Sequence, residues 1–342
     1  DRLSTLTTNA GGSTVINTSS VKTVTDQTYN DAVKLDTNTT LDSSASGNVT
    51  FNSTLDSVTG ETNSLLVNTA ATTTFNGLVG NTDRLSTLTT NAGGSTVINT
   101  SSVKTVTDQT YNDAVKLDTN TTLDSNSNGN ITFNSSLDSV TGETNSLLVN
   151  TVGTTTFNGL VGSADRLSTL TTDAGGSTVI NTASIKTDAD QTYNDAVTLD
   201  SNTTLDSNAS GNVTFNSTLN SVTSETNSLL VNTAGITIFN GLVGNTDRLS
   251  TLTTDAGGTT VINTSSVKTV TDQTYNDAVK LDANTTLDSS ASGNVTFTNT
   301  LDSATGETHS LLVNTSGTTT LNGLVGSSDR LSTLTTNAGG ST

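Results

Sequence analysis

The phrase TTTFNGLVG is copied along the chain at a fixed distance, and this repetition constrains the fold more than any other feature. It occupies positions 72–80 and returns unchanged at 154–162, as ITIFNGLVG at 236–244 and as TTTLNGLVG at 318–326. Each copy lies 82 residues after the last, and DRLSTLTT keeps the same interval from Asp1 onward. A fixed period of this kind is typical of arrays and solenoids, in which each unit packs on its neighbours.

The period divides the chain into four full repeats and the start of a fifth. The repeats cover 1–82, 83–164, 165–246 and 247–328, and the fifth begins at 329–342. We expect them to form one continuous solenoid within a longer chain, with any targeting segment, anchor and caps outside this sequence.

The composition excludes an ordinary globular core. The 342 residues include no Cys, Met, Trp or Pro, only 3% are aromatic and 30% are hydrophobic, which is below the usual share for globular chains. Such a composition also fits disorder, but here the apolar residues are β-formers at regular positions, as in NVTFNSTL and NSLLVNT. The absence of Cys excludes disulfides and thiol chemistry, and is compatible with an exported or a cytosolic protein.

The net charge of −19 argues against partners that carry phosphate. The 12 Lys and Arg residues are scattered over the repeats, whereas nucleic-acid binding requires them clustered. No apolar run is long enough to span a bilayer. We therefore expect no nucleic-acid partner and no membrane insertion, and we interpret the acidic residues as a solubilising coat.

A shorter period lies inside each repeat. In the first repeat the phrases TVIN, QTYN, VTFN and TTFN end at Asn17, Asn30, Asn52 and Asn76. Their alternation places a large apolar residue on one face and Thr on the other, and the Asn that follows marks a bend. About 20 residues per phrase predicts a parallel β-helix of three to four coils per repeat, although the uneven spacing also allows three coils of about 27 residues.

In a β-helix the backbones of successive coils pair about 4.8 Å apart, so like side chains lie above like ones. We expect the rings to form an inner stack and the Thr residues between them, such as Thr50, Thr74, Thr132 and Thr156, to be exposed. The predicted inner stack comprises Tyr29, Phe51, Phe75, Tyr111, Phe133, Phe157, Tyr193, Phe215, Phe239 and Tyr275.

The Asn after each large residue predicts a ladder, because an amide can donate to the copy on one side and accept from the copy on the other. The alternative is that Asn simply tolerates turns. Thr298 stands where the pattern expects Asn. The predicted ladder comprises Asn17, Asn30, Asn52, Asn76, Asn99, Asn112, Asn134 and Asn158.

The main structural alternative is a string of four β-sandwich adhesin domains. Such domains usually carry an aromatic-rich core with Trp or Tyr, and this chain has no Trp and only 4 Tyr. A solenoid needs fewer large residues, because each coil buries only a thin slice against its neighbours. The composition therefore favours an all-β parallel solenoid.

The phrases QTYNDAVKLDTNTTLD, NVTFNSTLDS, SLLVNTAATTTFNGLVG and LSTLTTNAGGSTVIN resemble the repeats of giant bacterial surface adhesins of the filamentous-haemagglutinin type. The resemblance covers essentially the whole chain. It implies a secreted protein on the bacterial cell surface, a right-handed parallel β-helix and a role in holding a binding tip away from the cell. It does not identify the ligand of that tip on a host cell, another cell or a surface.

Catalysis and cofactors have little support in the sequence. Parallel β-helices that cleave polysaccharides need paired carboxylates, and Asp36, Asp42, Asp56 and Glu61 are candidates, but each has a copy in other repeats. We therefore predict no enzyme and no catalytic residues. His309 is unique, and the simplest interpretation is a neutral surface substitution of a turn Asn.

Metal and ice binding are weaker hypotheses. TDQTYND and LDTNTTLD contain the oxygen ligands that Ca²⁺ accepts, but they match no recognised Ca²⁺ loop, so we predict no cofactor or metal site, with Ca²⁺ as the alternative. Thr at alternate positions in LSTLTT and TTTFN leaves ice binding or carbohydrate binding as alternative functions. The favoured function is an extracellular structural stalk or filament segment that serves adhesion or surface attachment, with fibre-forming self-association through open sheet edges.

Overall fold

The structure is a computed structural model that describes residues 1–337 and 339–342. The described residues form short β-strands and no helix, so the part of the chain that the structure covers has no helix able to cross a membrane. The strands are rich in Thr, Val, Leu and aromatic residues, which suit a pleated, half-buried surface.

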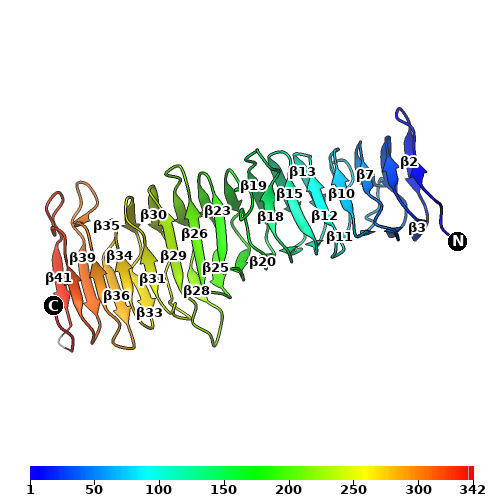
Figure 1. Cartoon of the computed structure of the whole chain (residues 1–342). Helices are drawn as coiled ribbons and strands as arrows, with labels where there is room; N and C mark the ends of the chain where they lie inside the picture. Colours follow the sequence, from blue (N-terminus) through cyan, green and yellow to red (C-terminus); the bar gives the residue numbers. More distant parts are fainter. Residues whose placement is uncertain (338) are drawn as a thin grey trace. The chain divides into compact units, whose positions relative to one another are not determined.

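The strands of the first two repeats follow one another in the same order (Figure 1). In the first repeat they are β1 (Leu6–Thr7), β2 (Ser13–Ile16), β3 (Ser20–Thr23), β4 (Gln27–Tyr29), β5 (Ala32–Leu35), β6 (Thr39–Ser43), β7 (Val49–Phe51), β8 (Leu55–Ser57), β9 (Leu65–Asn68) and β10 (Thr72–Phe75). In the second they are β11 (Leu88–Thr90), β12 (Ser95–Ile98), β13 (Ser102–Thr105), β14 (Gln109–Tyr111), β15 (Ala114–Leu117), β16 (Thr121–Ser125), β17 (Ile131–Phe133), β18 (Leu137–Ser139), β19 (Leu147–Thr151) and β20 (Thr154–Phe157).

The third and fourth repeats keep this order. The third contains β21 (Leu170–Thr172), β22 (Ser177–Ile180), β23 (Ser184–Thr187), β24 (Gln191–Tyr193), β25 (Ala196–Leu199), β26 (Thr203–Ser207), β27 (Val213–Phe215), β28 (Leu219–Ser221), β29 (Leu229–Thr233) and β30 (Ile236–Phe239). The rest of the chain contains β31 (Leu252–Thr254), β32 (Thr259–Ile262), β33 (Ser266–Thr269), β34 (Gln273–Tyr275), β35 (Ala278–Leu281), β36 (Thr285–Ser289), β37 (Val295–Phe297), β38 (Leu301–Ser303), β39 (Ser310–Asn314), β40 (Thr319–Leu321) and β41 (Thr333–Thr336).

The strands pair in parallel with strands one turn away, which makes the fold a β-solenoid. The described chain comprises about 15 turns of roughly 22 residues each. This confirms the predicted parallel β-helix and excludes a string of antiparallel sandwiches. The chain divides into two compact units, Asp1–Ser168 with Thr172–Gly176, and Thr169–Thr171 with Ser177–Thr342.

In the first unit the strands form three parallel stacks. One runs β1-β4-β7-β10-β12-β15-β18, and the second runs β3-β6-β9-β11-β14-β17-β20. The third contains β2-β5-β8 and β13-β16-β19, and Val79 connects these two groups through bridges to Leu55 and Val103. Each turn therefore contributes one segment to each of three faces.

The second unit has the same arrangement. Two of its stacks run β24-β27-β30-β32-β35-β38 and β23-β26-β29-β31-β34-β37-β40. The third contains β22-β25-β28 and β33-β36-β39-β41, and Val243 connects these groups through bridges to Leu219 and Val267.

Successive repeats are displaced by one face of the solenoid. In the first unit β4, β7 and β10 belong to one stack, whereas their counterparts β14, β17 and β20 belong to another. In the second unit β24, β27 and β30 are likewise separated from β34, β37 and β40. The reason is that 82 residues at roughly 22 per turn come to about three and two-thirds turns.

This non-integral number corrects one detail of the predicted coil pattern. Ile16 pairs with Leu35 in a stack other than that of Tyr29, because Tyr29 follows Ile16 by only 13 positions, too few for one turn. Ile98, the copy of Ile16 in the second repeat, instead follows Phe75 on the next turn. The fourth layer above the rings of the first repeat is therefore Ile98, and Ile262 likewise follows Phe239 of the third repeat.

Side chains alternate between the interior and the surface along each strand. In β7, Val49 and Phe51 are buried and Thr50 between them is half-buried. Thr74, Thr132 and Thr156 are also half-buried, so these Thr residues alternate with the buried rings as predicted but are less exposed than expected. Neighbouring turns about 4.8 Å away cover their flanks.

Candidate functional surfaces

The rings predicted to lie inside form short stacks, one in each repeat. Tyr29 faces Phe51 with ring centroids 5.2 Å apart and planes 10° from parallel, and Phe51 faces Phe75 at 5.4 Å and 7°. All three side chains are at most 1% exposed. The same geometry places the other predicted rings, Tyr111, Phe133, Phe157, Tyr193, Phe215, Phe239 and Tyr275, together with Phe297, inside the solenoid.

Each stack begins with a Tyr whose hydroxyl is held by a buried Gln. Tyr29 donates to Gln27 Oε1 at 3.0 Å, and Gln27 Nε2 donates to the Val21 carbonyl at 3.3 Å and the Asp42 carbonyl at 3.3 Å. Burial raises the pKa of the Tyr29 phenol. The phrase QTY thus supplies an internal polar bridge across the turn, a role that the sequence pattern alone did not reveal.

The asparagines at the bend form ladders along the surface. Asn52 Nδ2 donates to Asn30 Oδ1 at 2.7 Å, Asn76 donates to Asn52 at 2.8 Å, and Asn99 donates to Asn76 at 3.1 Å. Asn17 lies outside this ladder, because it follows β2 on another face.

The second repeat has a ladder in which Asn134 donates to Asn112 at 2.7 Å and Asn158 to Asn134 at 2.8 Å. In the fourth repeat Thr298 Oγ1 donates to Asn276 Oδ1 at 3.1 Å, so a hydroxyl replaces one amide of the ladder.

Two of the carboxylates considered for catalysis, Asp42 and Asp56, have partners on other turns. Asp42 forms an ion pair with Arg2 at 2.7 Å and accepts a hydrogen bond from Asn68 at 3.1 Å. Asp56 is 4% exposed and accepts from the Thr82 backbone N–H at 3.0 Å.

The other two candidates, Asp36 and Glu61, lie in the loops that follow β5 and β8. Glu61 accepts from the Asn63 amide at 3.2 Å, and Asp36 follows β5 at a half-buried position. The copies of Asp42 at Asp124 and Asp288 pair with Arg84 and Arg248. Asp42 and its copies therefore connect different turns of the solenoid, and Asp56 contacts the following turn.

A second set of acids, which sequence reasoning missed, is buried two residues after each Tyr. Asp113 is 3% exposed and accepts hydrogen bonds from Thr90 Oγ1 at 2.8 Å and from Thr96 Oγ1 at 2.9 Å. Burial raises the pKa of the Asp113 carboxyl, and the two Thr hydroxyls partly oppose this. The phrase YND is the only sequence signal for them, and it reads equally well as a turn. The counterparts are Asp31, Asp195 and Asp277.

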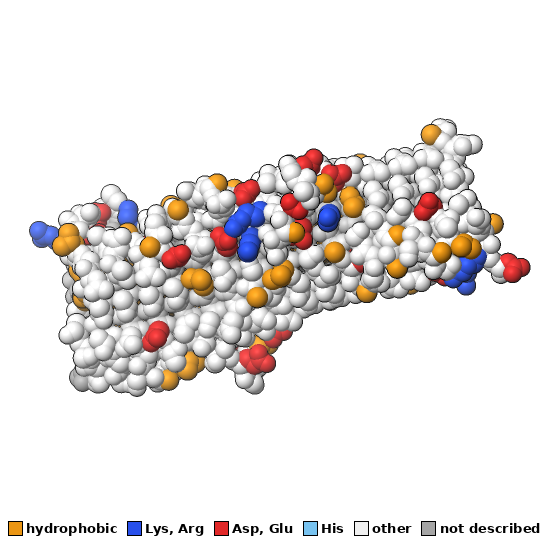
Figure 2. Space-filling model, viewed as in Figure 1, with side chains coloured by type: hydrophobic (Ala, Val, Ile, Leu, Met, Phe, Trp, Pro, Cys, Tyr) orange, Lys and Arg blue, Asp and Glu red, His pale blue; other side chains and the backbone are white. Residues whose placement is uncertain are grey.

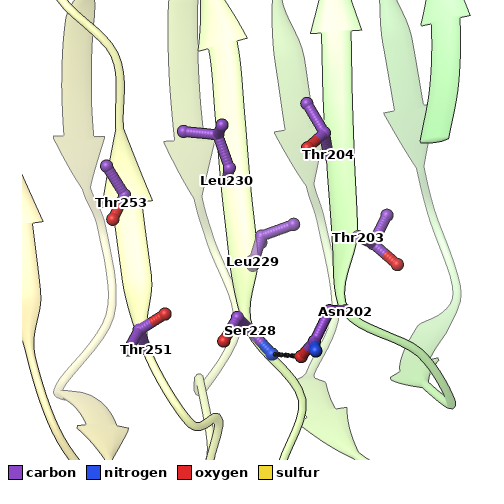
Figure 3. A pocket seen from close by; sticks show the side chains of 8 residues that line it. All are labelled: Asn202, Thr203, Thr204, Ser228, Leu229, Leu230, Thr251 and Thr253. Atoms are coloured by element: carbon purple, nitrogen blue, oxygen red, sulfur yellow. Dashed lines mark hydrogen bonds between the residues drawn. The ribbon is translucent and has the colours of Figure 1, made fainter. Parts of the chain in front are cut away.

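A groove recurs on the outer surface of the repeats. In the second unit Leu230 lies between Thr204 and Thr253 of the adjoining turns, and Asn202 accepts a hydrogen bond from the Ser228 N–H at 2.8 Å at the groove's edge (Figure 3). Corresponding grooves surround Leu66 and Leu312. Each groove presents one Leu among hydroxyl groups.

Charged side chains are dispersed over the face seen in Figure 2, where uncharged atoms dominate. Comparison of the chain with models of protein families, with curated proteins and with solved structures gives no match.

Proposed function

We propose that this chain is a structural segment, a stalk or filament, of a giant extracellular protein on a bacterial cell surface. One observation carries the proposal: the residues that recur in every repeat mostly form contacts between turns of the solenoid. The rings and the Asn ladders connect neighbouring turns, the Gln–Tyr bridges link strands on different faces, and the Arg–Asp pairs reach past the adjoining turn to the one beyond it. Such a unit sets length by copy number and needs no reaction centre.

The surface chemistry supports an exposed location. The net charge is −19, and the residues between the buried positions of the strands are mostly Thr, Ser, Asn and Asp. The resemblance to repeats of the filamentous-haemagglutinin type adds the expectation that a tip elsewhere in the protein serves adhesion. Its ligand is a cell or surface component outside this segment.

Ice binding is less well supported by the arrangement of Thr. Thr28, Thr50 and Thr74 form an outward row on three successive turns, but the next turns place Val97 and Lys116 in that row. The shift of one face per repeat thus interrupts each row before it becomes a flat array. Carbohydrate binding at the groove around Leu230 is the second candidate, because the groove combines an apolar centre with hydroxyl and amide groups.

The structural role is tested by the length added per repeat. Three and two-thirds turns at about 4.8 Å each should lengthen the solenoid by about 18 Å per repeat, whereas a globular domain of this size is about 30 Å across. Proteins with two, four, six and eight repeats should be measured by electron microscopy and small-angle scattering. Growth that is not linear in repeat number would contradict a spacer.

The location is tested separately with an antiserum raised against the purified chain. It should label intact, unpermeabilised cells that express the full protein, and protease added outside the cells should remove the label. Labelling that requires permeabilised cells would contradict a surface location and leave the spacer test unaffected.

A further inference from the structure

The fourth repeat contains a His–Glu–Asp cluster that the other repeats lack. His309 is the single His of the chain, and it replaces the Asn found at position 63 in the first repeat and at position 145 in the second. The ligand-capable atoms of Asp282, Glu307 and His309 all lie within 4.8 Å of one another.

The Asn of the other repeats closes the loop through hydrogen bonds. The Asn145 N–H donates to Ser139 Oγ at 2.9 Å, and its amide donates to the Leu117 carbonyl at 3.0 Å and to Glu143 Oε2 at 3.2 Å. The Asn145 amide nitrogen therefore donates hydrogen bonds and cannot coordinate a metal ion. The second repeat has Asp118 and Glu143 at the positions of Asp282 and Glu307, but no imidazole beside them.

The His in the fourth repeat keeps the backbone anchor but changes the side-chain chemistry. The His309 N–H donates to Ser303 Oγ at 2.9 Å, as Asn145 does to Ser139. The imidazole Nε2 lies 2.6 Å from Glu307 Oε2. The loop conformation that holds an amide in the second repeat here directs an imidazole nitrogen at a carboxylate.

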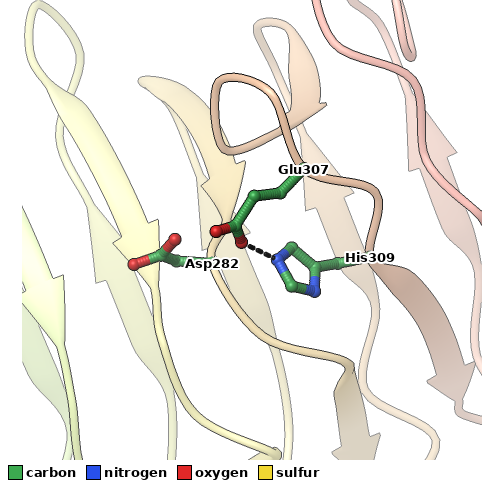
Figure 4. Close-up of side chains that lie close together, drawn as sticks. All are labelled: Asp282, Glu307 and His309. Atoms are coloured by element: carbon green, nitrogen blue, oxygen red, sulfur yellow. Dashed lines mark hydrogen bonds and ion pairs between the residues drawn. The ribbon is translucent and has the colours of Figure 1, made fainter.

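The third group comes from the neighbouring turn. Asp282 follows β35, whereas Glu307 and His309 lie in the loop between β38 and β39. Figure 4 shows the Asp282 carboxylate beside that of Glu307, with the His309 ring on the other side of Glu307. Glu307 is exposed and the other two are half-buried, so an ion can enter from solvent.

We propose that Asp282, Glu307 and His309 bind one divalent transition-metal ion, with Zn²⁺ as the representative. One imidazole nitrogen and two carboxylate oxygens form a mixed set that suits Zn²⁺, Ni²⁺ or Cu²⁺, whereas Ca²⁺ takes oxygen ligands. A bound dication also neutralises the two adjacent carboxylates. The remaining coordination positions are left to water or to a ligand from another molecule.

The test measures Zn²⁺ binding to the whole chain by titration calorimetry, with two reciprocal variants. The wild type should bind one equivalent. His309→Asn restores the residue that the other repeats carry, so it should fold normally and lower the affinity at least about tenfold. Asn145→His builds the same trio with Asp118 and Glu143, and should raise the stoichiometry to two.

The single His supplies a second readout. Its imidazole proton signals in NMR should broaden on addition of Ni²⁺, and Ca²⁺ in the same concentration range should leave them unchanged. Equal Zn²⁺ binding by the wild type and by His309→Asn would show that only the general acidic surface attracts the ion and would overturn the proposal. An Asn145→His variant that is folded by circular dichroism but gains no site would overturn it as well.

Discussion

The Tyr111 hydroxyl donates a hydrogen bond to Gln109 Oε1 across 3.0 Å inside the solenoid, where both side chains are completely buried. Gln109 in turn donates to the Val103 carbonyl at 3.2 Å and to the Asp124 carbonyl at 3.2 Å. The two side chains thus join three segments of the first unit through polar contacts that water does not reach.

Replacing Tyr111 with Phe should destabilise the chain although the ring stack is kept. The change leaves Gln109 Oε1 buried without its donor, which costs about 1–3 kcal/mol. Urea unfolding followed by circular dichroism measures the loss, and the outward Thr110→Ala serves as the control with a change within about 0.5 kcal/mol. Equal effects of the two substitutions would show that the buried bridge contributes no stability.

Phe133 lies in the middle of its stack, with Tyr111 at 5.3 Å on one side and Phe157 at 5.5 Å on the other. Phe133→Ala should lower the free energy of unfolding by about 3–5 kcal/mol, because it leaves a cavity between two rings. The neighbouring Thr132→Ala removes a half-buried outward side chain and should cost much less. A thermal or urea melt that ranks them in the opposite order would contradict the observed register.

Stability should depend on pH through Asp113 and Asp277, since burial raises the pKa of each carboxyl. The folded chain then binds more protons than the unfolded chain just above the ordinary carboxyl range, so the free energy of unfolding falls as pH rises through the raised pKa. Urea midpoints between about pH 4 and pH 7 should show this decrease. Asp113→Asn should flatten the profile, and an unchanged profile in Asp113→Asn/Asp277→Asn would refute the assignment.

Gly129 lies where the backbone of a neighbouring turn approaches closely. A Cβ there would stand 2.2 Å from the carbonyl carbon of Thr107 and 2.4 Å from Ser125 Oγ. Gly129→Ala should therefore cost about 3 kcal/mol, because the backbone of the neighbouring turn has to move. Gly12→Ala is the matched control, since its Cβ would meet only Asp31 Oδ2 at 3.8 Å. Thermal melts that show equal losses for the two would contradict the close packing of these turns.

The Asn ladder and the inner ring stack show which features could be predicted from local sequence patterns. Phe51, Phe75 and Asn52 occur at spacings near one turn, so their positions above one another could be predicted from the sequence. Ile16 and Asn17 carry the same phrase but lie on a different face. The phrase determines which way a side chain points, but the number of residues between two phrases determines which face it occupies.

The burial of Asp113 could not be predicted from the sequence pattern. Its neighbours Tyr111 and Asn112 mark a bend, and an Asp at a bend is usually solvated. Here Thr90 and Thr96 of other turns supply the hydroxyls that allow its burial. Partners so far away in the sequence cannot be assigned until the turn length is known.

The 82-residue period, the inward rings and the parallel pairing of successive turns can be derived from the sequence, because alternating β-formers repeated at a constant interval leave few other ways to bury their apolar faces. The turn of roughly 22 residues, the displacement of each repeat by one face, the buried Gln–Tyr bridge and the proximity of His309 to Asp282 are visible only in the folded chain. These features depend on the number of residues in each turn. That number is set by packing between successive turns around the stacked rings, so it cannot be derived from any single segment of the sequence.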